Sequence, residues 1–328
     1  MTIQSCNHMV GVDLGGTNVR AAVVTREGQI IGEGRRPSLA MEEPEVSIGQ
    51  IIEAIREAMD RAGVTSFDVC GIGMAVPGRH NSKEGIVIWS PNFKDMWRGV
   101  KLAAPIREAI GVPVYMANDA NTAALGEFRF GAGRDVNSMV MITLGTGVGG
   151  GVIIDGKVLG GSSSGGGEIG HQVINPNSCY RCECGNFGDL EAEARRDTII
   201  ERALREIYAG RESLLTTMVE PKYLDLTPAT IAQAASKGDQ VSLEVMAETG
   251  RFVGIGVANA INFLNPDMVV IGGGISQAGD VLWEPIRRTV CANALEESLD
   301  VCQIVPAKLG DNAGIMGGVV LVLQASSD

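Results

Sequence analysis

The sequence predicts an α/β protein of two domains, and three observations support that prediction. The chain has 328 residues, more than one hydrophobic core usually serves. Apolar runs of strand length alternate with stretches whose apolar residues recur at helical spacing, a pattern typical of buried sheets covered by helices. A plan of strand, glycine-rich turn and strand also occurs twice, which indicates two related halves.

The elements of the first half follow from apolar runs and the turn residues between them. Three strands separated by turns are expected over residues 9–34, and further strands over 69–78 and 112–119. Helices are expected over residues 45–64, where Gly63 is the stop signal, from about residue 100, and over 118–130.

The second half repeats the pattern. A strand, a glycine turn and a second strand are expected over residues 138–156, and a strand running into a glycine turn over 267–276. Helical patterns fill residues 191–209 and 241–264, and the last predicted helix covers 313–324.

Charge and composition exclude some classes of protein. The formal net charge is -12 and no run of Lys or Arg forms a basic stripe, so nucleic acid and anionic membrane are poor partners. The first residues do not read as a signal peptide and no long uncharged apolar run occurs, so we expect a cytoplasmic protein. Among the seven cysteines, Cys6, Cys70, Cys291 and Cys302 are scattered, and for most of them we expect a role as a small buried hydrophobe.

Two kinds of motif point to bound ligands. Three glycine turns, at residues 13–18, 144–151 and 271–276, each follow an apolar strand, and their backbone N–H groups could face phosphate oxygens. Their spacing matches neither common nucleotide fingerprint. One histidine and three cysteines also crowd into residues 170–191, which in a cytosolic chain favours a metal over disulfides.

These motifs, in this order, resemble a known family. "DLGGTN", "AND" at 117–119, "LGTGVGGG", "GGGEIGH" at 165–171, "CECGNFGDLE" and "IGGGIS" are similar to segments of the ROK family of sugar kinases and repressors. The resemblance implies a two-domain actin-like ATPase (ribonuclease H-like) fold with a cleft between the domains. A smaller domain would comprise residues 1–117, joined by the C-terminal helix 312–328, and a larger domain, 118–311, would carry the zinc segment.

The resemblance also implies an activity, which is the ATP- and Mg²⁺-dependent phosphorylation of a hexose. Glucose is the expected substrate, and mannose, allose, fructose, N-acetylmannosamine and polyphosphate as donor stay open. Asp119 would act as general base, because a carboxylate can accept the proton of a sugar hydroxyl. Sugar contacts would come from Gly78, Asn92, Asn118, Asp119, Glu168, His171 and Glu191. Nucleotide contacts would come from Asp13, Gly15, Gly16, Thr17, Thr146, Gly147, Gly273 and Gly274, with Asp13 near Mg²⁺.

Two other functions compete with the kinase. Repressors of this family carry a helix-turn-helix domain before the first glycine turn, and only 12 residues precede Asp13 here, so we expect the enzyme. A structural protein held together by its metal segment would leave the glycine turns without a role. Relatives are commonly dimers or tetramers, so a homo-oligomer is expected.

The metal segment departs from the family pattern at one position. The pattern binds structural zinc through a His, a C-x-C pair and a third Cys after a glycine, which correspond here to His171, Cys182, Cys184 and Asp189. Cys179, three residues before Cys182, could supply the missing thiolate, which zinc favours over carboxylate. We therefore expect His171, Cys179, Cys182 and Cys184 as ligands, with Asp189 or a metal-free loop as alternatives. The zinc would hold His171 and Glu191 toward the sugar.

Overall fold

The computed structural model describes residues 6–90, 93, 95–163, 165–219, 223 and 225–326. The chain divides into two compact units. Unit 1 comprises Met1–Asp135, Gly151–Gly167 and Lys308–Asp328, and unit 2 comprises Val136–Gly150 and Glu168–Ala307. The expected domain boundary between residues 117 and 118 stays a prediction. Within the described ranges, no helix combines the length and apolar character that a membrane crossing requires.

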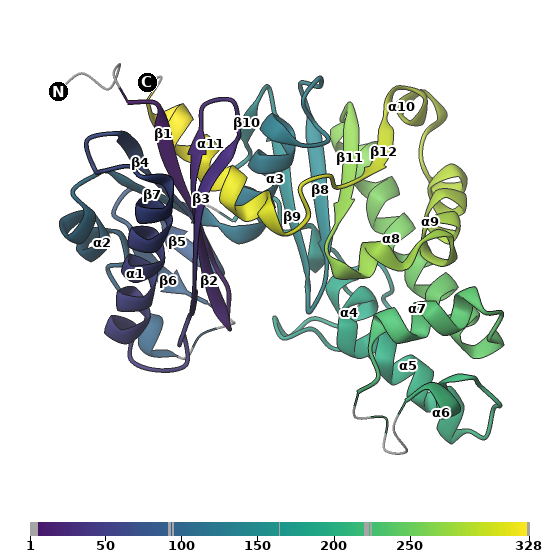
Figure 1. Cartoon of the computed structure of the whole chain (residues 1–328). Coiled ribbons are helices and arrows are strands. Elements are labelled where there is room, and N and C mark those ends of the chain that lie inside the picture. Colours follow the sequence, from purple (N-terminus) through teal and green to yellow (C-terminus); the bar gives the residue numbers. More distant parts are fainter. Residues whose placement is uncertain are drawn as a thin grey trace. The chain divides into compact units, whose positions relative to one another are not determined.

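Unit 1 is built on a five-stranded sheet of order β3-β2-β1-β4-β7 (Figure 1). The strands β1 (His8–Leu14), β2 (Asn18–Thr25) and β3 (Ile30–Pro37) form an antiparallel meander. β4 (Val69–Val76) and β7 (Val114–Asn118) lie beyond β1 and are parallel to it. The remaining elements are a small hairpin of β5 (Arg79–Asn81) and β6 (Ile86–Trp89), the 3-10 turns η2 (Asp95–Trp97) and η5 (Gly310–Asn312), and the helices α1 (Pro44–Ala62), α2 (Ala103–Ile110), α3 (Asp119–Phe130) and α11 (Ala313–Ala325).

Helices cover both faces of this sheet, and the alternation of β1 explains which helix takes which face. Val10, Val12 and Leu14 belong to the apolar cluster that includes Ile51 and Ile55 of α1. Gly11 points the other way, and a Cβ there would overlap the backbone of Ile315 in α11. α1 and α11 therefore pack on opposite faces.

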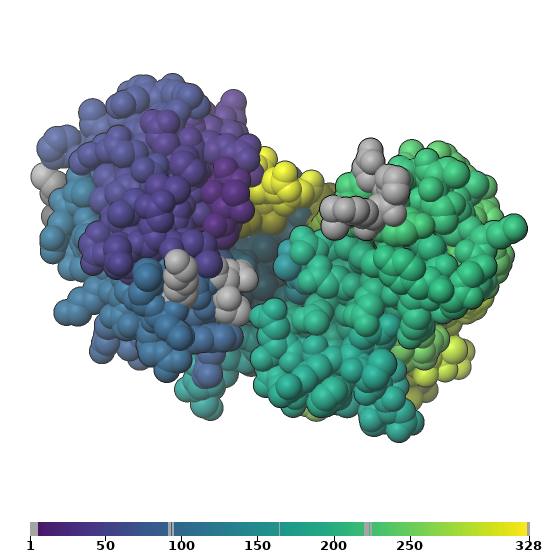
Figure 2. Space-filling view, turned by 90° about the horizontal axis from the view of Figure 1, so that it is seen from below, coloured from purple at the N-terminus to yellow at the C-terminus, as the bar shows by residue number. Residues whose placement is uncertain are grey.

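The close approach of α11 depends on glycines on both sides of the contact. Gly318 of α11 meets Gly73 of β4 backbone to backbone, and Gly317 meets the carbonyl of Thr122 in α3. Nine of the 13 residues of α11 are buried. In Figure 2, yellow atoms near the C-terminus are seen beside the purple atoms of the N-terminal part of the chain.

Unit 2 contains most of a second five-stranded sheet, of order β10-β9-β8-β11-β12. Its strands are β8 (Met139–Leu144), β9 (Val148–Ile154), β10 (Lys157–Val158), β11 (Met268–Gly272) and β12 (Gln303–Pro306), with β9 passing from unit 2 into unit 1 after Gly150. The helical elements of unit 2 are η3 (Ile169–His171), α4 (Leu190–Ala194), α5 (Arg196–Tyr208), α6 (Leu215–Met218), α7 (Pro228–Ser236), α8 (Gln240–Leu264), η4 (Gly274–Ala278), α9 (Asp280–Asn293) and α10 (Glu296–Val301).

Two sequence predictions were wrong. The helical pattern over 191–209 forms two helices, because Arg195 is extended and the N–H of Arg196 donates to the carbonyl of Gly145 at 3.0 Å instead of continuing the helix. The scattered cysteines are mostly not small buried hydrophobes. Cys6 and Cys70 form a disulfide and Cys291 is exposed, which leaves Cys302 as the buried one of these four.

Candidate active site

Three neighbouring parallel strands of unit 1 end at or near residues that the resemblance predicts to bind the substrates or Mg²⁺. In the registers of the sheet, Asp13 of β1 pairs with Ala75 of β4, and Val76 of β4 pairs with Asn118 of β7. Gly78 follows β4 by two residues. Because the carboxyl ends of parallel strands share one edge, the structure brings Asp13, Gly78 and Asn118 to the same edge.

Asn118 and Asp119 form the N-terminus of α3. The Asn118 Oδ1 accepts hydrogen bonds from the N–H groups of Ala120 (3.0 Å) and Asn121 (3.1 Å), and its Nδ2 donates to the carbonyl of Gly78 at 3.1 Å. Asp119 is the first helical residue, and its Oδ1 accepts from the N–H of Ala120 at 2.9 Å. The cap fixes the start of the helix, so the Asp119 carboxylate is held at the positive end of the helix dipole.

Asp13 is a half-buried carboxylate near a second one. Burial, followed by the charge of Asp119, raises the pKa of Asp13 to about 6, while Arg20 acts in the opposite direction. The backbone of α11 also comes close, because a Cβ at Gly314 would lie 2.9 Å from the Asp13 carboxyl carbon. A carboxylate whose pKa is raised by a neighbouring carboxylate forms, together with that neighbour, a donor set that fits a hard divalent cation such as Mg²⁺.

The first glycine turn is open. The Gly15 N–H donates to the Asn18 carbonyl at 2.9 Å, which closes the turn. Gly16 and Thr17 are exposed, and a Cβ added to Gly16 would meet no atom within 4 Å. Packing therefore does not require glycine at position 16, and the backbone there is accessible to a ligand.

The other two glycine turns lie side by side in unit 2. Thr143 of β8 pairs with Gly272 of the parallel strand β11, and each strand is followed by its turn. Gly273 has a φ of 84°, and a Cβ there would overlap the backbone of Leu144. Thr146 is exposed in the turn after β8, and Gly274 follows Gly273. Both predicted nucleotide segments of this unit thus meet at one sheet edge.

Glu191 lies against the turn after β8. Its Oε2 accepts a hydrogen bond from the Val148 N–H at 3.0 Å, and a Cβ at Gly147 would collide with the same carboxylate. Its Oε1 accepts a weak hydrogen bond from the Cys182 thiol at 3.2 Å. Glu191 therefore joins a predicted nucleotide segment to the cysteine segment.

Four side chains converge to form a candidate metal centre. The ligand atoms of His171, Cys182, Cys184 and Asp189 all lie within 4.8 Å of one another. The His171 Nδ1 is 3.3 Å from the Asp189 Oδ2 and 3.5 Å from the Cys182 Sγ, and the Cys184 Sγ is 3.4 Å from the same Asp189 oxygen. One imidazole, two thiols and one carboxylate are a donor set that tetrahedral zinc accepts.

Asp189 has two roles in this centre. Its Oδ1 accepts from the Ala192 N–H at 2.7 Å, so it is the N-cap of α4, while its Oδ2 faces His171 and Cys184.

Burial raises the pKa of the Cys182 thiol above its usual range. A bound cation would favour the thiolate and offset that effect.

The remaining predicted residues lie as follows. The His171 Nε2, on the side of the ring away from the metal centre, is 4.0 Å from the exposed Glu168 carboxylate. Cys179 is exposed and does not belong to the group of four. Asn92 lies outside the described residues.

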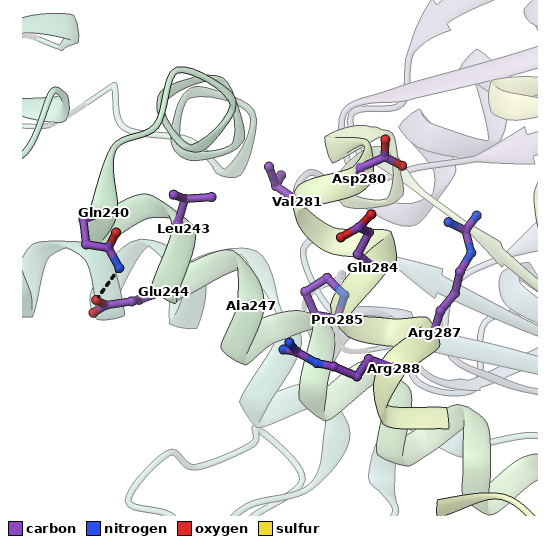
Figure 3. A pocket seen from close by; sticks show the side chains of 10 residues that line it. All are labelled: Gln240, Leu243, Glu244, Ala247, Asp280, Val281, Glu284, Pro285, Arg287 and Arg288. Carbon is purple, nitrogen blue, oxygen red and sulfur yellow. Dashed lines mark hydrogen bonds between the residues drawn. The ribbon is translucent and has the colours of Figure 1, made fainter. Parts of the chain in front are cut away.

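Two cavities among the described residues differ in how they relate to these positions. A cavity of about 760 Å³ in unit 2 lies between α8 and α9 (Figure 3), where the Gln240 Nε2 donates to Glu244 at 2.9 Å, and none of the predicted residues lines it. A cavity of about 1030 Å³ in unit 1 runs along α3, and Asn118 is the one predicted residue among its lining residues.

Sequence reasoning missed Arg20 as a part of the site. Its Nη1 donates to the Asp311 carbonyl and its Nη2 to the Asn312 Oδ1, both at 2.8 Å, and its charge lowers the pKa of the neighbouring Asp13. It thereby fixes the segment before α11 beside Asp13. The partners are separated by 291 and 292 positions in the chain, so no local pattern could have indicated the contact.

Comparison with known proteins identifies the family. A profile of the ROK family matches residues 9–325. The glucokinase of Halalkalibacterium halodurans is 36% identical over 96% of this chain and 94% of its own length. The chain belongs to the ROK family, and the resemblance inferred from its motifs is confirmed.

Solved structures agree with the fold. The ROK family glucokinase of Streptomyces griseus, in complex with glucose and AMPPNP, matches with a TM-score of 0.79 and 31% identity, over 97% of this chain and 99% of that chain. The α/β fold of the actin-like ATPases is therefore confirmed. The xylose repressor of Caldicellulosiruptor bescii is 32% identical over 96% of this chain, which spans 78% of that protein.

Proposed function

We propose that this protein is an ATP-dependent hexose kinase with glucose as its principal substrate. Membership of the ROK family and the similarity to glucokinases support the reaction class. The observation that carries the proposal is the capped N-terminus of α3, which holds the Asp119 carboxylate close enough to Asp13 to raise its pKa. A coupled assay with Mg²⁺ and ATP over glucose, mannose, allose, fructose and N-acetylmannosamine tests it. Phosphorylation of none of these hexoses would refute it.

In this proposal Asp119 is the general base. It accepts the proton of the sugar hydroxyl while that oxygen forms a bond to the γ-phosphorus and the bond to the β-γ bridging oxygen breaks, releasing ADP. The Asn118 side chain caps the helix that begins with Asp119 and also donates to the Gly78 carbonyl. It thereby fixes the general base relative to a proposed sugar-binding turn. The other proposed sugar contacts are Asn92, Glu168, His171 and Glu191.

The glycine turns would hold the nucleotide. We assign Gly15, Gly16 and Thr17 of unit 1, and Thr146, Gly147, Gly273 and Gly274 of unit 2, to this role, because exposed backbone N–H groups bind phosphates without net positive charge. Asp13 would lie near Mg²⁺, which neutralises phosphate charge during transfer. Replacing ATP by polyphosphate in the same assay tests the choice of donor.

We further propose that His171, Cys182, Cys184 and Asp189 bind one structural zinc ion. The grouping of their ligand atoms supports this set over the one that includes Cys179. Because Asp189 also caps α4, a bound ion would fix the helix whose first turn carries Glu191. The homo-oligomer and the cytoplasmic location stay predictions.

A sugar-responsive regulator is the second candidate, favoured by the similarity to the xylose repressor. The same assay separates the two, because a regulator would bind sugar without phosphorylating it. Calorimetric binding of a hexose without turnover, together with sugar-dependent binding of an operator DNA, would favour the regulator.

A further inference from the structure

Arg202 of α5 is a buried cation. Its side chain is 2% exposed and it forms an ion pair with Glu193 of α4, which is 1% exposed. Its Nη1 also donates to the Glu193 main-chain carbonyl at 2.6 Å, and its Nε is 3.2 Å from the Glu248 carboxylate of α8. A buried charge is retained only when its N–H groups find such partners, so this guanidinium is held in one orientation.

The same guanidinium reaches the segment that carries the candidate metal centre. It lies over the ring of Tyr180, 5.0 Å from the ring centroid, and also over the ring of Phe252 in α8, whose centroid is 5.2 Å away. Tyr180 stands between Cys179 and the candidate ligand Cys182. Arg195 adds a second contact to this segment, since its Nη2 donates to the Arg181 carbonyl at 3.2 Å.

Glu193 forms a hydrogen bond to an earlier residue of the same segment, Asn175. Its Oε1 accepts a hydrogen bond from the Asn175 Nδ2 at 2.8 Å, and Asn175 bonds through its N–H to the Gly188 carbonyl at 3.0 Å. Glu193 also lies one helical turn after Asp189 and two residues after Glu191, on the same short helix. The pair therefore contacts the loop 172–189 at Asn175 and Tyr180, and Glu193 is itself part of the helix that follows the loop.

We propose that Arg202 and Glu193 are positioning residues that hold the loop 172–189 and, through α4, orient His171 and Glu191 toward the hexose. This proposal rests on the proposed function for its kinetic consequence. The pair is a second anchor of the loop, because it contacts Asn175 and Tyr180 and none of the four candidate metal ligands is among these two residues. Two anchors explain how a partly exposed loop can fix the helix after it, and with it the Glu191 carboxylate.

Arg202→Lys tests the proposal with the smallest change. Lysine keeps the charge, so Glu193 is not left unpaired, but it lacks the planar fork that bonds Glu193 in two places and stacks on Tyr180. Arg211→Lys is the matched control. Arg211 makes a similar fork to Glu244, at 2.6 and 3.0 Å, on an exposed surface of the same unit.

Hydrogen exchange of the backbone amides gives the decisive measurement, because it needs neither activity nor metal. We expect faster exchange in Arg202→Lys confined to residues 172–195, and no such change in Arg211→Lys. We also expect the KM for the hexose to rise about tenfold with little change in kcat, and transfer of the metal to a colorimetric chelator to quicken by about the same factor.

Other outcomes overturn the proposal. Unchanged exchange in the loop, or faster exchange spread evenly over unit 2, would make the pair a general stabiliser only. If Arg202→Lys fails to fold, the double variant Arg202→Met with Glu193→Met removes both charges together and is measured in the same way. A wild-type protein that phosphorylates no hexose would count against the proposed function, and the exchange experiment would still decide this one.

Discussion

Asp119 is the residue on which the proposed chemistry depends most. Asp119→Asn keeps the size of the side chain and the start of α3, but it removes the proton acceptor. We expect kcat to fall by about two orders of magnitude or more, the scale of lost general-base catalysis, with the affinity for the hexose largely kept. Steady-state kinetics and calorimetric titration with the sugar measure the two effects. Turnover close to wild type would remove Asp119 from the mechanism.

Asp13 makes a pH-dependent contribution to stability that can be predicted in sign. Its pKa is about 6 in the folded protein, raised from the ordinary aspartate value of 3.8. The folded state therefore binds more protons between these values, and this carboxyl costs stability as the pH rises from about 4 to 6. We expect Asp13→Asn, which resembles the protonated form, to be the more stable protein above pH 6, by about 3 kcal/mol without ligands.

Thermal unfolding of both proteins between pH 4 and pH 8 measures this difference. The gap in Tm should open as the pH rises through 4 to 6 and then stay constant. A gap that is independent of pH, or that closes as the pH rises, would contradict the assigned pKa.

Single substitutions can also identify the fourth metal ligand. We expect about one zinc per chain. Asp189→Asn keeps the helix cap, since Asn caps as well as Asp, but it removes an anionic ligand. It should therefore release zinc to a chelator faster than Cys179→Ser, which alters an exposed thiol. The reverse order would give the fourth position to Cys179, and a fully active protein without zinc would refute the centre.

At the scale of elements, helix packing predicts that Gly→Ala substitutions in α11 and in α1 have opposite effects on stability. A Cβ at Gly317 would overlap the Thr122 carbonyl of α3, whereas one at Gly49 of α1 would meet nothing within 4 Å. Gly317→Ala should destabilise the protein by about 1–3 kcal/mol or more, the usual cost of overpacking. Gly49→Ala should stabilise it by about 0.5–1 kcal/mol, because alanine favours the helix. Urea unfolding of both variants checks the signs, and a stable Gly317→Ala protein would show that the two helices can move apart.

The sequence was informative where an element is determined locally. The predicted helix over 45–64 ends as expected, because Gly63 adopts a φ of 67° at the C-cap. The break at Arg195 could not be predicted, since the carbonyl that competes for the Arg196 N–H belongs to Gly145, far away in the chain. Periodicity likewise gives no sign that Arg202 is buried, because the cost is offset by partners on α4 and α8.

The candidate site likewise contains residues that local motifs could predict and residues that depend on contacts between distant parts of the chain. The motifs indicated the residues at the ends of β1, β7, β8 and β11, since position after a strand is a local property. They could not choose between Cys179 and Asp189. That choice depends on how the loop folds back, so that the Gly188 carbonyl accepts from the Asn175 N–H and the Gly188 N–H donates to the Tyr180 carbonyl. The disulfide between Cys6 and Cys70 depends in the same way on the pairing of two strands.

At the scale of the whole molecule, the assignment of ligand residues to both compact units predicts a change of shape in solution. Joint binding of glucose and a non-hydrolysable ATP analogue should reduce the radius of gyration, because closure would exclude water that could otherwise accept the phosphoryl group. Small-angle X-ray scattering with each ligand alone and with both measures the change. An unchanged radius with both ligands bound would contradict closure.

The position of α11 in unit 1 also has a consequence for biosynthesis. Glycines of β1, β4 and α3 leave room for the backbone of this one helix. Among the described residues, the atoms that lie against these glycines belong to α11. The ribosome makes residues 168–307, which belong to unit 2, before it reaches α11. The part of the first sheet that α11 covers therefore stays exposed on the nascent chain while unit 2 is synthesised, and it is during this interval that we expect the chain to depend on chaperones.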